Sequence, residues 1–242
     1  MNAIEIRGLK RRFGEKIAVD IDSLEIAQGE FFALLGVNGA GKTTTIRMLS
    51  CLLAPSEGTA SVMGCDVSAQ ADRARAQTAV SPQETAVAGN LTVRENLELI
   101  AGIHGFSASA SRAKAEELAG SLVLTGEMNT RAKKLSGGMQ RRLSIAMALI
   151  GDPKVIFLDE PTLGLDVLAR RELWKVIASL KGKITVILTT HYLEEAQALA
   201  DRVGIMVEGR LAAVGTVDEI VATHGGGSLE NAFVAIAEEA AK

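Results

Sequence analysis

Alternating apolar and polar residues near the start of the chain predict strands with one exposed face. Ile4 and Ile6 lie two residues apart, and Ile17, Val19 and Ile21 repeat that spacing. Because successive side chains of a strand point to opposite faces, the spacing places these residues on one side. We therefore expect short N-terminal strands with one buried and one solvent-facing side.

Three runs that are apolar at nearly every position predict strands of a second kind. They cover residues 31–35, 155–158 and 184–188 and are rich in branched or aromatic side chains. Runs without alternation are typical of strands covered on both faces, as in a parallel sheet flanked by helices. Because helical patterns lie between these runs, the expected fold class is α/β.

The sequence from about residue 84 to residue 152 has the composition and spacing of helices. Residues 111–124 are rich in Ala, Glu, Lys and Leu. An apolar stripe recurs at helical spacing, at Met139, Leu143, Ala146 and Ile150. Asp152-Pro153 ends this helix, because proline disfavours helical geometry in the residue before it. We expect a mainly helical lobe at about 84–152, inserted between strands of the sheet.

Residues 1–224 are expected to form one domain, which includes this helical lobe. A glycine-rich joint follows at Gly225-Gly226-Gly227-Ser228, and a short helix completes the part at 225–242. The first residues carry charges at Glu5 and Arg7 and do not have the pattern of a signal peptide. A membrane span needs roughly 18 or more consecutive apolar residues, and no stretch of the sequence has them.

Composition excludes a disordered chain, because 48% of the 242 residues are hydrophobic and 23% are charged. The net charge of −3 and the 3% of aromatic residues argue against a nucleic-acid partner. Three arginine pairs are interpreted as solvated surface residues: Arg11-Arg12, Arg141-Arg142 and Arg170-Arg171. Cys51 and Cys65 form no metal or disulfide pattern, so we expect small core residues in a reducing compartment.

Residues 36–43, GVNGAGKT, fill every fixed position of the phosphate-binding pattern G-x-x-x-x-G-K-[ST]. Glycines let successive backbone N–H groups point at a phosphate, and the following helix adds its positive end. Lys42 would supply a cation to the β- and γ-phosphates, and the Thr43 hydroxyl would bind Mg²⁺. A chance glycine-rich turn is disfavoured by the strand before it and the helix after it. The predicted nucleotide-binding residues are Gly36, Val37, Asn38, Gly39, Ala40, Gly41, Lys42, Thr43 and Thr44.

Two adjacent carboxylates, Asp159 and Glu160, end the apolar run at 155–158. They would lie at the carboxyl end of a strand, where α/β sheets bind their ligands. Neighbouring side chains of a strand point in different directions, so Asp159 can hold the Mg²⁺ shell while Glu160 orients and polarises the attacking water. An isolated pair would be only a solvated strand end, and the complete phosphate loop favours the catalytic interpretation.

A second anion site is predicted at Leu135-Ser136-Gly137-Gly138. Ser136 has the position of an N-cap for the helix that follows, and the two glycines leave its first N–H groups unshielded. Alone, such a helix start would be no more than a cap. A chain with one lysine-bearing phosphate loop and two anion sites requires a further explanation.

That explanation comes from the segment LSGGMQRR at 135–142, which resembles the signature motif of ATP-binding cassette (ABC) proteins. The order of the motifs is similar too: phosphate loop, Gln83 in Ser-Pro-Gln, signature, Asp-Glu pair, Gly164-Leu165-Asp166, and His191 in Thr-Thr-His. The resemblance covers residues 2 to about 220. It implies a P-loop NTPase (RecA-like) core with a mixed, largely parallel sheet, an N-terminal antiparallel β part and an inserted helical subdomain.

The resemblance also implies site roles and a head-to-tail dimer around two ATP molecules. In that dimer Ser136, Gly137 and Gly138 of one chain face the ATP on the other chain's phosphate loop, and Asp166 lies at the seam. Phe13 would stack on adenine, although a plain core phenylalanine is the alternative. Gln83 would bind Mg²⁺ together with Thr43 and Asp159, and His191 would contact the γ-phosphate. Glu160, His191 and Lys42 form the expected catalytic set, with ATP and Mg²⁺ as cofactors.

The family further implies a partner, a separate membrane-spanning permease subunit at the cytoplasmic face of the cell membrane. Residues 84–96 hold the position where relatives grip membrane helices. With residues 215–220 and 228–233 they resemble the ABC-2, drug- and ion-exporter-like branch. The ATPase dimer is expected to be a homodimer or a heterodimer with another ABC ATPase subunit.

Three other functions are alternatives to this interpretation. A soluble ABC ATPase in cofactor assembly is the main alternative to a transporter subunit. Translation and DNA-repair ATPases normally carry two cassettes, a long coiled coil or zinc-binding cysteines, none of which this sequence shows. A non-catalytic regulatory subunit is disfavoured because Lys42, Asp159, Glu160 and His191 are all present.

Overall fold

The computed structural model describes residues 1–225 and 227–240. The predicted glycine-rich joint therefore lies partly outside the described residues, since Gly226 is not among them. At the N-terminal side, four strands pair antiparallel: β1 (Asn2–Phe13), β2 (Lys16–Ala27), β4 (Glu57–Val62) and β5 (Cys65–Asp66). The predicted one-sided burial is confirmed for Ile4, Ile6, Val19 and Ile21. It is wrong for Ile17, which is exposed beside the β1–β2 turn.

A second group of strands runs parallel: β6 (Thr78–Ser81), β7 (Val155–Asp159), β8 (Thr185–Thr190), β3 (Phe31–Leu35) and β9 (Arg202–Val207). β10 (Arg210–Gly215) is antiparallel to β9 and meets β2 where Arg210 pairs with Asp20. Within the described residues the strand order is β5-β4-β1-β2-β10-β9-β3-β8-β7-β6. The predicted α/β class, with a mixed sheet and an antiparallel N-terminal part, is confirmed.

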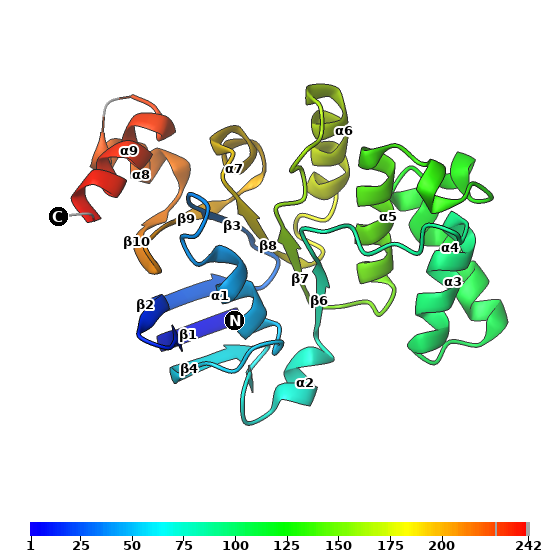
Figure 1. The fold of residues 1–242 in the computed structure, drawn as a ribbon, viewed down its shortest axis with the longest axis horizontal. Helices are drawn as coiled ribbons and strands as arrows, with labels where there is room; N and C mark the ends of the chain where they lie inside the picture. Colours follow the sequence, from blue (N-terminus) through cyan, green and yellow to red (C-terminus); the bar gives the residue numbers. More distant parts are fainter. Residues whose placement is uncertain (226, 241–242) are drawn as a thin grey trace.

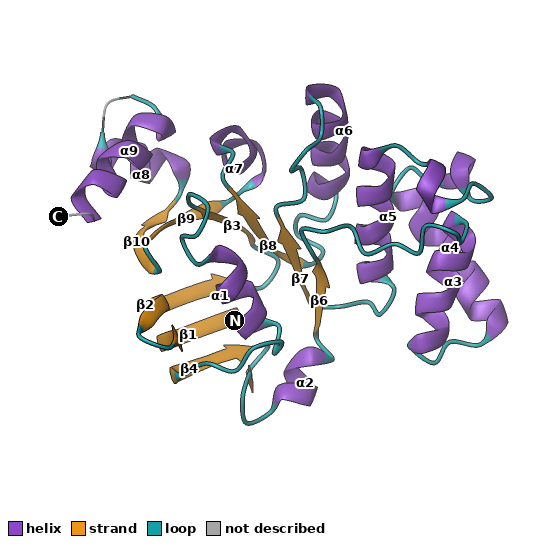
Figure 2. Ribbon diagram, in the orientation of Figure 1, coloured by secondary structure: helices purple, strands orange, loops and turns teal. Residues whose placement is uncertain are grey.

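Helices cover the sheet, and further helices lie beyond both of its ends (Figures 1 and 2). Along the sheet lie α1 (Lys42–Leu49), α2 (Ala71–Arg75), α6 (Val167–Ala178) and α7 (Leu193–Leu199). Between β6 and β7 the chain forms α3 (Val93–Ile103), α4 (Ala108–Ser121), α5 (Gly137–Leu149) and the 3₁₀ turns Thr125–Glu127 and Ala132–Lys134. At the opposite end of the molecule are α8 (Val217–His224) and α9 (Leu229–Ala240). None of the described helices combines the length and the apolar character needed to cross a membrane.

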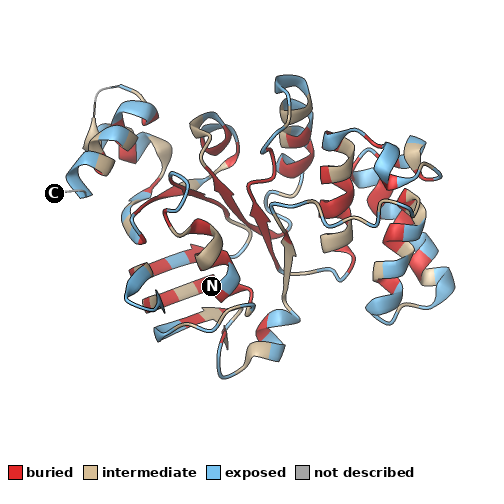
Figure 3. Ribbon diagram, viewed as in Figure 1, coloured by how far each residue is buried: buried red, intermediate tan, exposed pale blue. Residues whose placement is uncertain are grey.

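The sheet separates two apolar cores, and β3 contributes to both because its side chains alternate. Phe31, Ala33 and Leu35 pack with helices of the α3–α7 side. Phe32 and Leu34 pack with β1, β2 and α1 on the other side. Figure 3 shows the central strands as the most continuously buried part of the molecule. This double burial explains why their sequences are apolar without alternation.

Two expectations about burial need correction, one for an arginine pair and one for a cysteine. Arg141 and Arg142 were expected to be solvated, but their exposed fractions are 5% and 8%. Both lie on the inner side of α5, where backbone carbonyl groups accept their hydrogen bonds. Cys65 is buried as expected, whereas Cys51 is only partly buried at the edge of the core. A charged residue of a helix can thus lie in the protein interior when hydrogen-bond acceptors are within its reach.

Candidate functional site

A cavity of about 800 Å³ lies at the carboxyl end of β3. It brings together Phe13 from β1, the loop at 38–44, Gln83 after β6 and Glu160 after β7. These segments are distant in sequence and meet because parallel strands end at one edge of the sheet. Ser136, Gly137, Gly138 and Asp166 are not among the residues that line this cavity.

The loop between β3 and α1 has a backbone that requires glycine. Gly39 and Gly41 have φ of +84° and +103°, which L side chains rarely adopt. A Cβ atom on Gly41 would lie 2.6 Å from the Ala18 carbonyl oxygen, and one on Gly36 would lie 2.6 Å from that of Met206. No described side chain caps the first turn of α1. Its N–H groups are therefore available to an anion at this point.

Lys42, Glu160 and His191 form a connected charged cluster. The Lys42 Nζ atom lies 3.1 Å from Glu160 Oε1 and donates to the Gly36 carbonyl at 2.7 Å. The other oxygen of Glu160, Oε2, is 2.6 Å from His191 Nδ1. Glu160 has φ of +48°, a strained value for a residue other than glycine. This turn at the end of β7 holds the carboxylate between the lysine and the histidine.

Asp159 is held by two threonines on the other side of the same strand end. Thr43 Oγ1 donates to Asp159 Oδ1 at 3.1 Å, and Thr189 Oγ1 donates to the same atom at 2.6 Å. The Thr189 hydroxyl also accepts a hydrogen bond from the Glu160 backbone N–H at 3.1 Å. Sequence reasoning missed Thr189, although it stands two residues before His191 and ends an apolar strand with a polar side chain.

Phe13 and Gln83 border the cavity from opposite sides of the sheet edge. The Phe13 ring is 50% exposed, so the alternative of a core phenylalanine is wrong. The Arg11 guanidinium lies 4.7 Å from the centre of this ring. The Gln83 side chain is exposed, while its backbone carbonyl accepts a hydrogen bond from Arg141 at 2.6 Å.

The signature segment lies at the start of α5, next to the start of α6. The Ser136 hydroxyl accepts from the Met139 N–H at 3.3 Å and so caps α5, as predicted. A Cβ atom on Gly138 would lie 3.3 Å from the Ala169 Cβ of α6. Asp166 caps α6, because its Oδ1 accepts from the Leu168 and Ala169 N–H groups at 2.9 Å each. Ser136 and Gly137 are exposed there.

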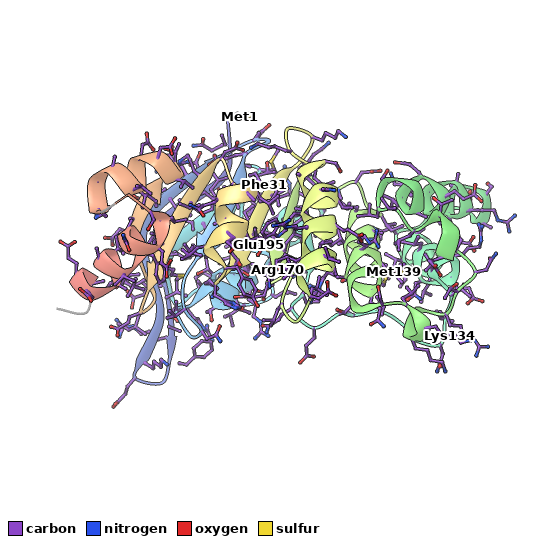
Figure 4. All side chains as sticks on the ribbon, turned by 90° about the horizontal axis from the view of Figure 1, so that it is seen from above. Met1, Phe31, Lys134, Met139, Arg170 and Glu195 are labelled. Carbon is purple, nitrogen blue, oxygen red and sulfur yellow. The ribbon has the colours of Figure 1, made fainter. Side chains whose placement is uncertain are left out.

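A buried carboxyl group, Glu195 of α7, was also missed from the sequence. Its side chain has no exposed surface and accepts a hydrogen bond from Trp174 Nε1 at 3.0 Å. Figure 4 shows it in the middle of the molecule, while Lys134 lies toward the end formed by α3–α5. Burial raises the pKa of Glu195, and hydrogen bonds with the Thr190 hydroxyl and Trp174 oppose that rise. Glutamate is rarely buried completely unless it has a partner.

Known proteins share both the sequence and the fold of this chain. Residues 19–163 match the family described as ABC transporter. The chain is 44% identical to the daunorubicin resistance ATP-binding protein DrrA3 of Streptomyces coeruleorubidus, over 94% of this chain and 72% of that protein. It is also 44% identical to the Nod factor export ATP-binding protein I of Paraburkholderia xenovorans, over 92% of this chain and 73% of that one.

A solved structure of the ATP-binding subunit of an ABC transporter has a TM-score of 0.83 and 30% identity, covering 97% of this chain and 99% of that one. This similarity confirms the expected P-loop NTPase core. The family match extends over the phosphate loop and over Asp159 and Glu160 at the carboxyl end of β7. The chain therefore belongs to the ABC transporter family, as an ATP-binding subunit that hydrolyses ATP.

Proposed function

We propose that this chain is the nucleotide-binding subunit of an ABC exporter and that it hydrolyses ATP at sites shared between two ATPase subunits. One observation carries the proposal. The cavity holds Lys42 and Glu160, whereas the exposed N-terminus of α5 at Ser136 lies outside its lining. A second chain placed head to tail would bring its own Ser136 to this cavity and complete the site.

The residues present fit ATP together with Mg²⁺. Mg²⁺ in such sites is bound by few protein groups, with water and phosphate oxygens as its other ligands. Thr43 and Gln83 would hold the ion, with Asp159 beside it, 3.1 Å from the Thr43 hydroxyl. When bound, Mg²⁺ neutralises charge that develops on the phosphates.

The three residues of the charged cluster have separate tasks in this proposal. The Lys42 ammonium exchanges Glu160 for phosphate oxygens and stabilises their charge in the transition state. Glu160, released by Lys42 and still held by His191, then orients and polarises the attacking water. Because His191 uses Nδ1 for Glu160 at 2.6 Å, its Nε2 atom is left to contact the γ-phosphate.

The surface beside Ser136 suits the second subunit, either a copy of this chain or another ABC ATPase subunit. Val167 and Leu168, which follow Asp166, are 61% and 74% exposed. Large exposed apolar side chains next to a polar site are typical of a protein interface. In the dimer Asp166 would lie at the seam, and the half-exposed ring of Phe13 would stack on the adenine.

The proposed direction of transport is export. It rests on the relatives, whose names describe drug resistance and Nod factor export. We place the chain peripherally at the cytoplasmic face of the cell membrane, on a separate membrane-spanning permease. Residues 84–92 and the first turn of α3 form the proposed contact. The predicted surface at 84–96 needs correction at two residues, because Val93 and Asn96 are buried. The Asn96 amide carries a further role. It accepts from the Ala88 N–H at 2.8 Å and so shapes this loop from inside.

The shared site is tested with Glu160→Gln, which keeps the shape of the side chain but cannot polarise water as a carboxylate does. We expect hydrolysis to fall by about 10²-fold or more, in the range of a lost catalytic base. ATP with Mg²⁺ should then convert the isolated chain from monomer to dimer in light scattering. Adding Lys42→Ala to this variant removes the phosphate contact and should keep the chain monomeric. A monomer at saturating, demonstrably bound ATP would contradict the shared site.

A further inference from the structure

Glu195 is a buried acidic side chain to which the proposed function assigns no task. It has no exposed surface and lies in the first turn of α7, four residues after His191. It is not among the residues that line the nucleotide cavity. Because burying a carboxyl group this completely is costly, the contacts that it makes indicate what it does.

Glu195 is bound to the turn that carries His191. Its backbone N–H donates to the Tyr192 carbonyl oxygen at 3.2 Å. The Tyr192 N–H in turn donates to the Thr190 hydroxyl at 2.9 Å. The same hydroxyl forms a hydrogen bond with the Glu195 carboxyl group and so lowers its pKa. The turn at 190–192 is thus held by Glu195 through the residues on both sides of the histidine.

Helix α6 contacts this turn and the carboxyl group through two side chains one helical turn apart. Trp174 Nε1 donates to Glu195 Oε1 at 3.0 Å. The guanidinium of Arg170, four residues earlier, lies 4.3 Å from the centre of the Tyr192 ring. Residues four apart lie on one face of a helix, and Figure 4 shows Arg170 and Glu195 in the middle of the molecule. One face of α6 therefore fixes both the carboxyl group and the turn.

The second carboxyl oxygen of Glu195 has a complementary neighbour in the loop that follows Glu160. Thr162 of this loop has no exposed surface, and its hydroxyl lowers the pKa of the Glu195 carboxyl group. Within the described part of the chain, neither Glu195 Oε2 nor Thr162 Oγ1 makes a well-formed hydrogen bond. One is an acceptor and the other can donate, so a small movement of the loop would join them.

We propose that Glu195 is a positioning residue for hydrolysis, which fixes His191 from one side and the loop after Glu160 from the other. When Lys42 exchanges Glu160 for phosphate oxygens, His191 is the group that still holds this carboxylate. A fixed His191 keeps its 2.6 Å contact with Glu160 and so keeps the carboxylate aligned with the attacking water. This inference rests on the proposed function, because Glu195 acts through Glu160 and His191 and has no contact with ATP.

The first test follows the indole N–H of Trp174, the single tryptophan of the chain. Isotope-labelled tryptophan gives one indole signal in NMR spectra, and its hydrogen exchange reports on the bond to Glu195. We expect this N–H to exchange at least about tenfold faster in Glu195→Ala, because local opening sets the exchange rate. Glu195→Gln keeps an acceptor and should stay within about twofold of the unmodified chain. Glu194→Gln, an exposed neighbour on α7, is the matched control and should not change the exchange.

The second test measures steady-state ATP hydrolysis per chain that binds nucleotide. In Glu195→Ala we expect kcat to fall by about tenfold or more, because a small misplacement of catalytic groups is costly. KM for ATP should change less than about twofold, since Glu195 does not line the cavity. Glu195→Gln should restore kcat to within about threefold of the unmodified chain, because an amide can accept from Trp174 and donate to Thr162. Ile220→Ala, a cavity in the same core but on α8, controls for lost stability and should keep kcat.

The outcomes separate this inference from the proposed function. If Glu160→Gln hydrolyses ATP like the unmodified chain, the proposed function loses its catalytic base, while the indole exchange still decides whether Glu195 holds α6 and the His191 turn. If Glu195→Ala keeps the kcat of Ile220→Ala, or if Glu195→Gln is as slow as Glu195→Ala, the inference is overturned. If Glu195→Ala does not fold, Thr162→Val decides. Its kcat should fall at least about threefold, and an unchanged kcat overturns the inference.

Discussion

At Gly41 the backbone leaves no room for a side chain. Its φ is +103°, and a Cβ atom would lie 2.6 Å from the Ala18 carbonyl oxygen and 2.9 Å from the Met206 methyl carbon. The shape of the phosphate loop thus follows from two constraints at one residue, a positive φ and a close backbone neighbour. The pattern G-x-x-x-x-G-K-[ST] locates this residue in the sequence, and the structure supplies the reason that it must be glycine.

We expect Gly41→Ala to weaken ATP binding strongly and to lower the free energy of unfolding by about 1–3 kcal/mol, the usual cost of a strained residue. Binding of a fluorescent ATP analogue and urea unfolding measure the two effects. Gly105→Ala is the matched control, because Gly105 has φ of +83° but open space around it. It should lose about 1 kcal/mol at most from backbone strain and bind ATP normally. Equal ATP affinity in both variants would contradict the steric explanation.

The stability of the folded chain should depend on pH through a single carboxyl group, that of Glu195. Its pKa is raised by burial, so the folded state binds this proton more tightly than the unfolded state does. The resulting loss of stability is absent below the ordinary pKa of about 4.5 and develops as pH rises above it. Glu195→Gln removes the ionisation while keeping an acceptor for Trp174.

We therefore expect Glu195→Gln to gain stability relative to the unmodified chain as pH increases from 4 to 8. Urea unfolding at several pH values measures this difference. Glu194→Gln on the same helix is the control, because Glu194 is exposed, and it should follow the unmodified chain. A difference that is constant across this pH range would show that the Glu195 carboxyl group is not protonated more readily in the folded chain.

At the scale of elements, adjacent strand ends build the proposed metal-binding side of the site. Asp159 of β7 pairs in register with Thr189 of β8, which places the threonine hydroxyl 2.6 Å from the carboxylate. The sequence predicted both strands from their apolar runs but contained no information on their relative register. That register, set by the parallel pairing, makes Thr189 a partner of Asp159 even though 30 residues separate them in sequence.

Thr189→Val should test this pairing, since valine keeps the shape of threonine without its hydroxyl group. We expect the Mg²⁺ concentration for half-maximal hydrolysis to rise roughly 10-fold or more, as when the partner of a metal ligand is lost. Thr185→Val is a control on the same strand, because the Thr185 hydroxyl is buried and accepts only from the Gly29 N–H at 2.9 Å. Loss of a buried hydrogen bond should cost each variant about 1–3 kcal/mol of stability. A shift in the Mg²⁺ requirement shared by both variants would contradict a specific role.

At the scale of the whole molecule, the cavity and the proposed permease contact lie on one continuous path. Gln83 lines the cavity, and Glu84 next to it is exposed. Arg94 on α3 is less suited to a partner, because its guanidinium already pairs with Glu116 of α4 at 3.1 Å. The structure therefore favours Glu84 as the residue through which to test the contact.

We expect affinity purification from detergent-solubilised native membranes to recover two copies of this chain with two six-span subunits or one fused equivalent. With Glu84→Lys, recovery of the permease should fall by about tenfold, because a reversed charge is repelled across an interface. The basal ATPase activity of the isolated chain should stay near normal. Glu238→Lys on α9, an exposed charge at the opposite end, is the control and should not change recovery. A purely soluble partner would instead support the cofactor-assembly alternative.

The sequence by itself determined the elements whose pattern is local and the motifs whose spacing is fixed. β3, β7 and β8 follow from runs that are apolar at nearly every position, and the phosphate loop, Asp159-Glu160 and the Ser136 cap follow from short patterns. Strands such as β6 and β10 escaped prediction because they are only partly buried and contain no continuous run of bulky apolar residues of the kind seen in β7. Their hydrogen bonds come from distant strands, which a local pattern does not contain.

Only the tertiary structure decided which side chains meet. Thr189, Arg141 and Glu195 each acquire a hydrogen-bond partner from another element. Arg141 even reversed its expected environment, from solvent to the interior, because two carbonyl oxygens of the Gln83 segment lie 2.6 Å from its guanidinium. Burial of a charge depends on the acceptors that packing brings to it. Such distances are set by the arrangement of strands and helices around the sheet and are not contained in the local sequence.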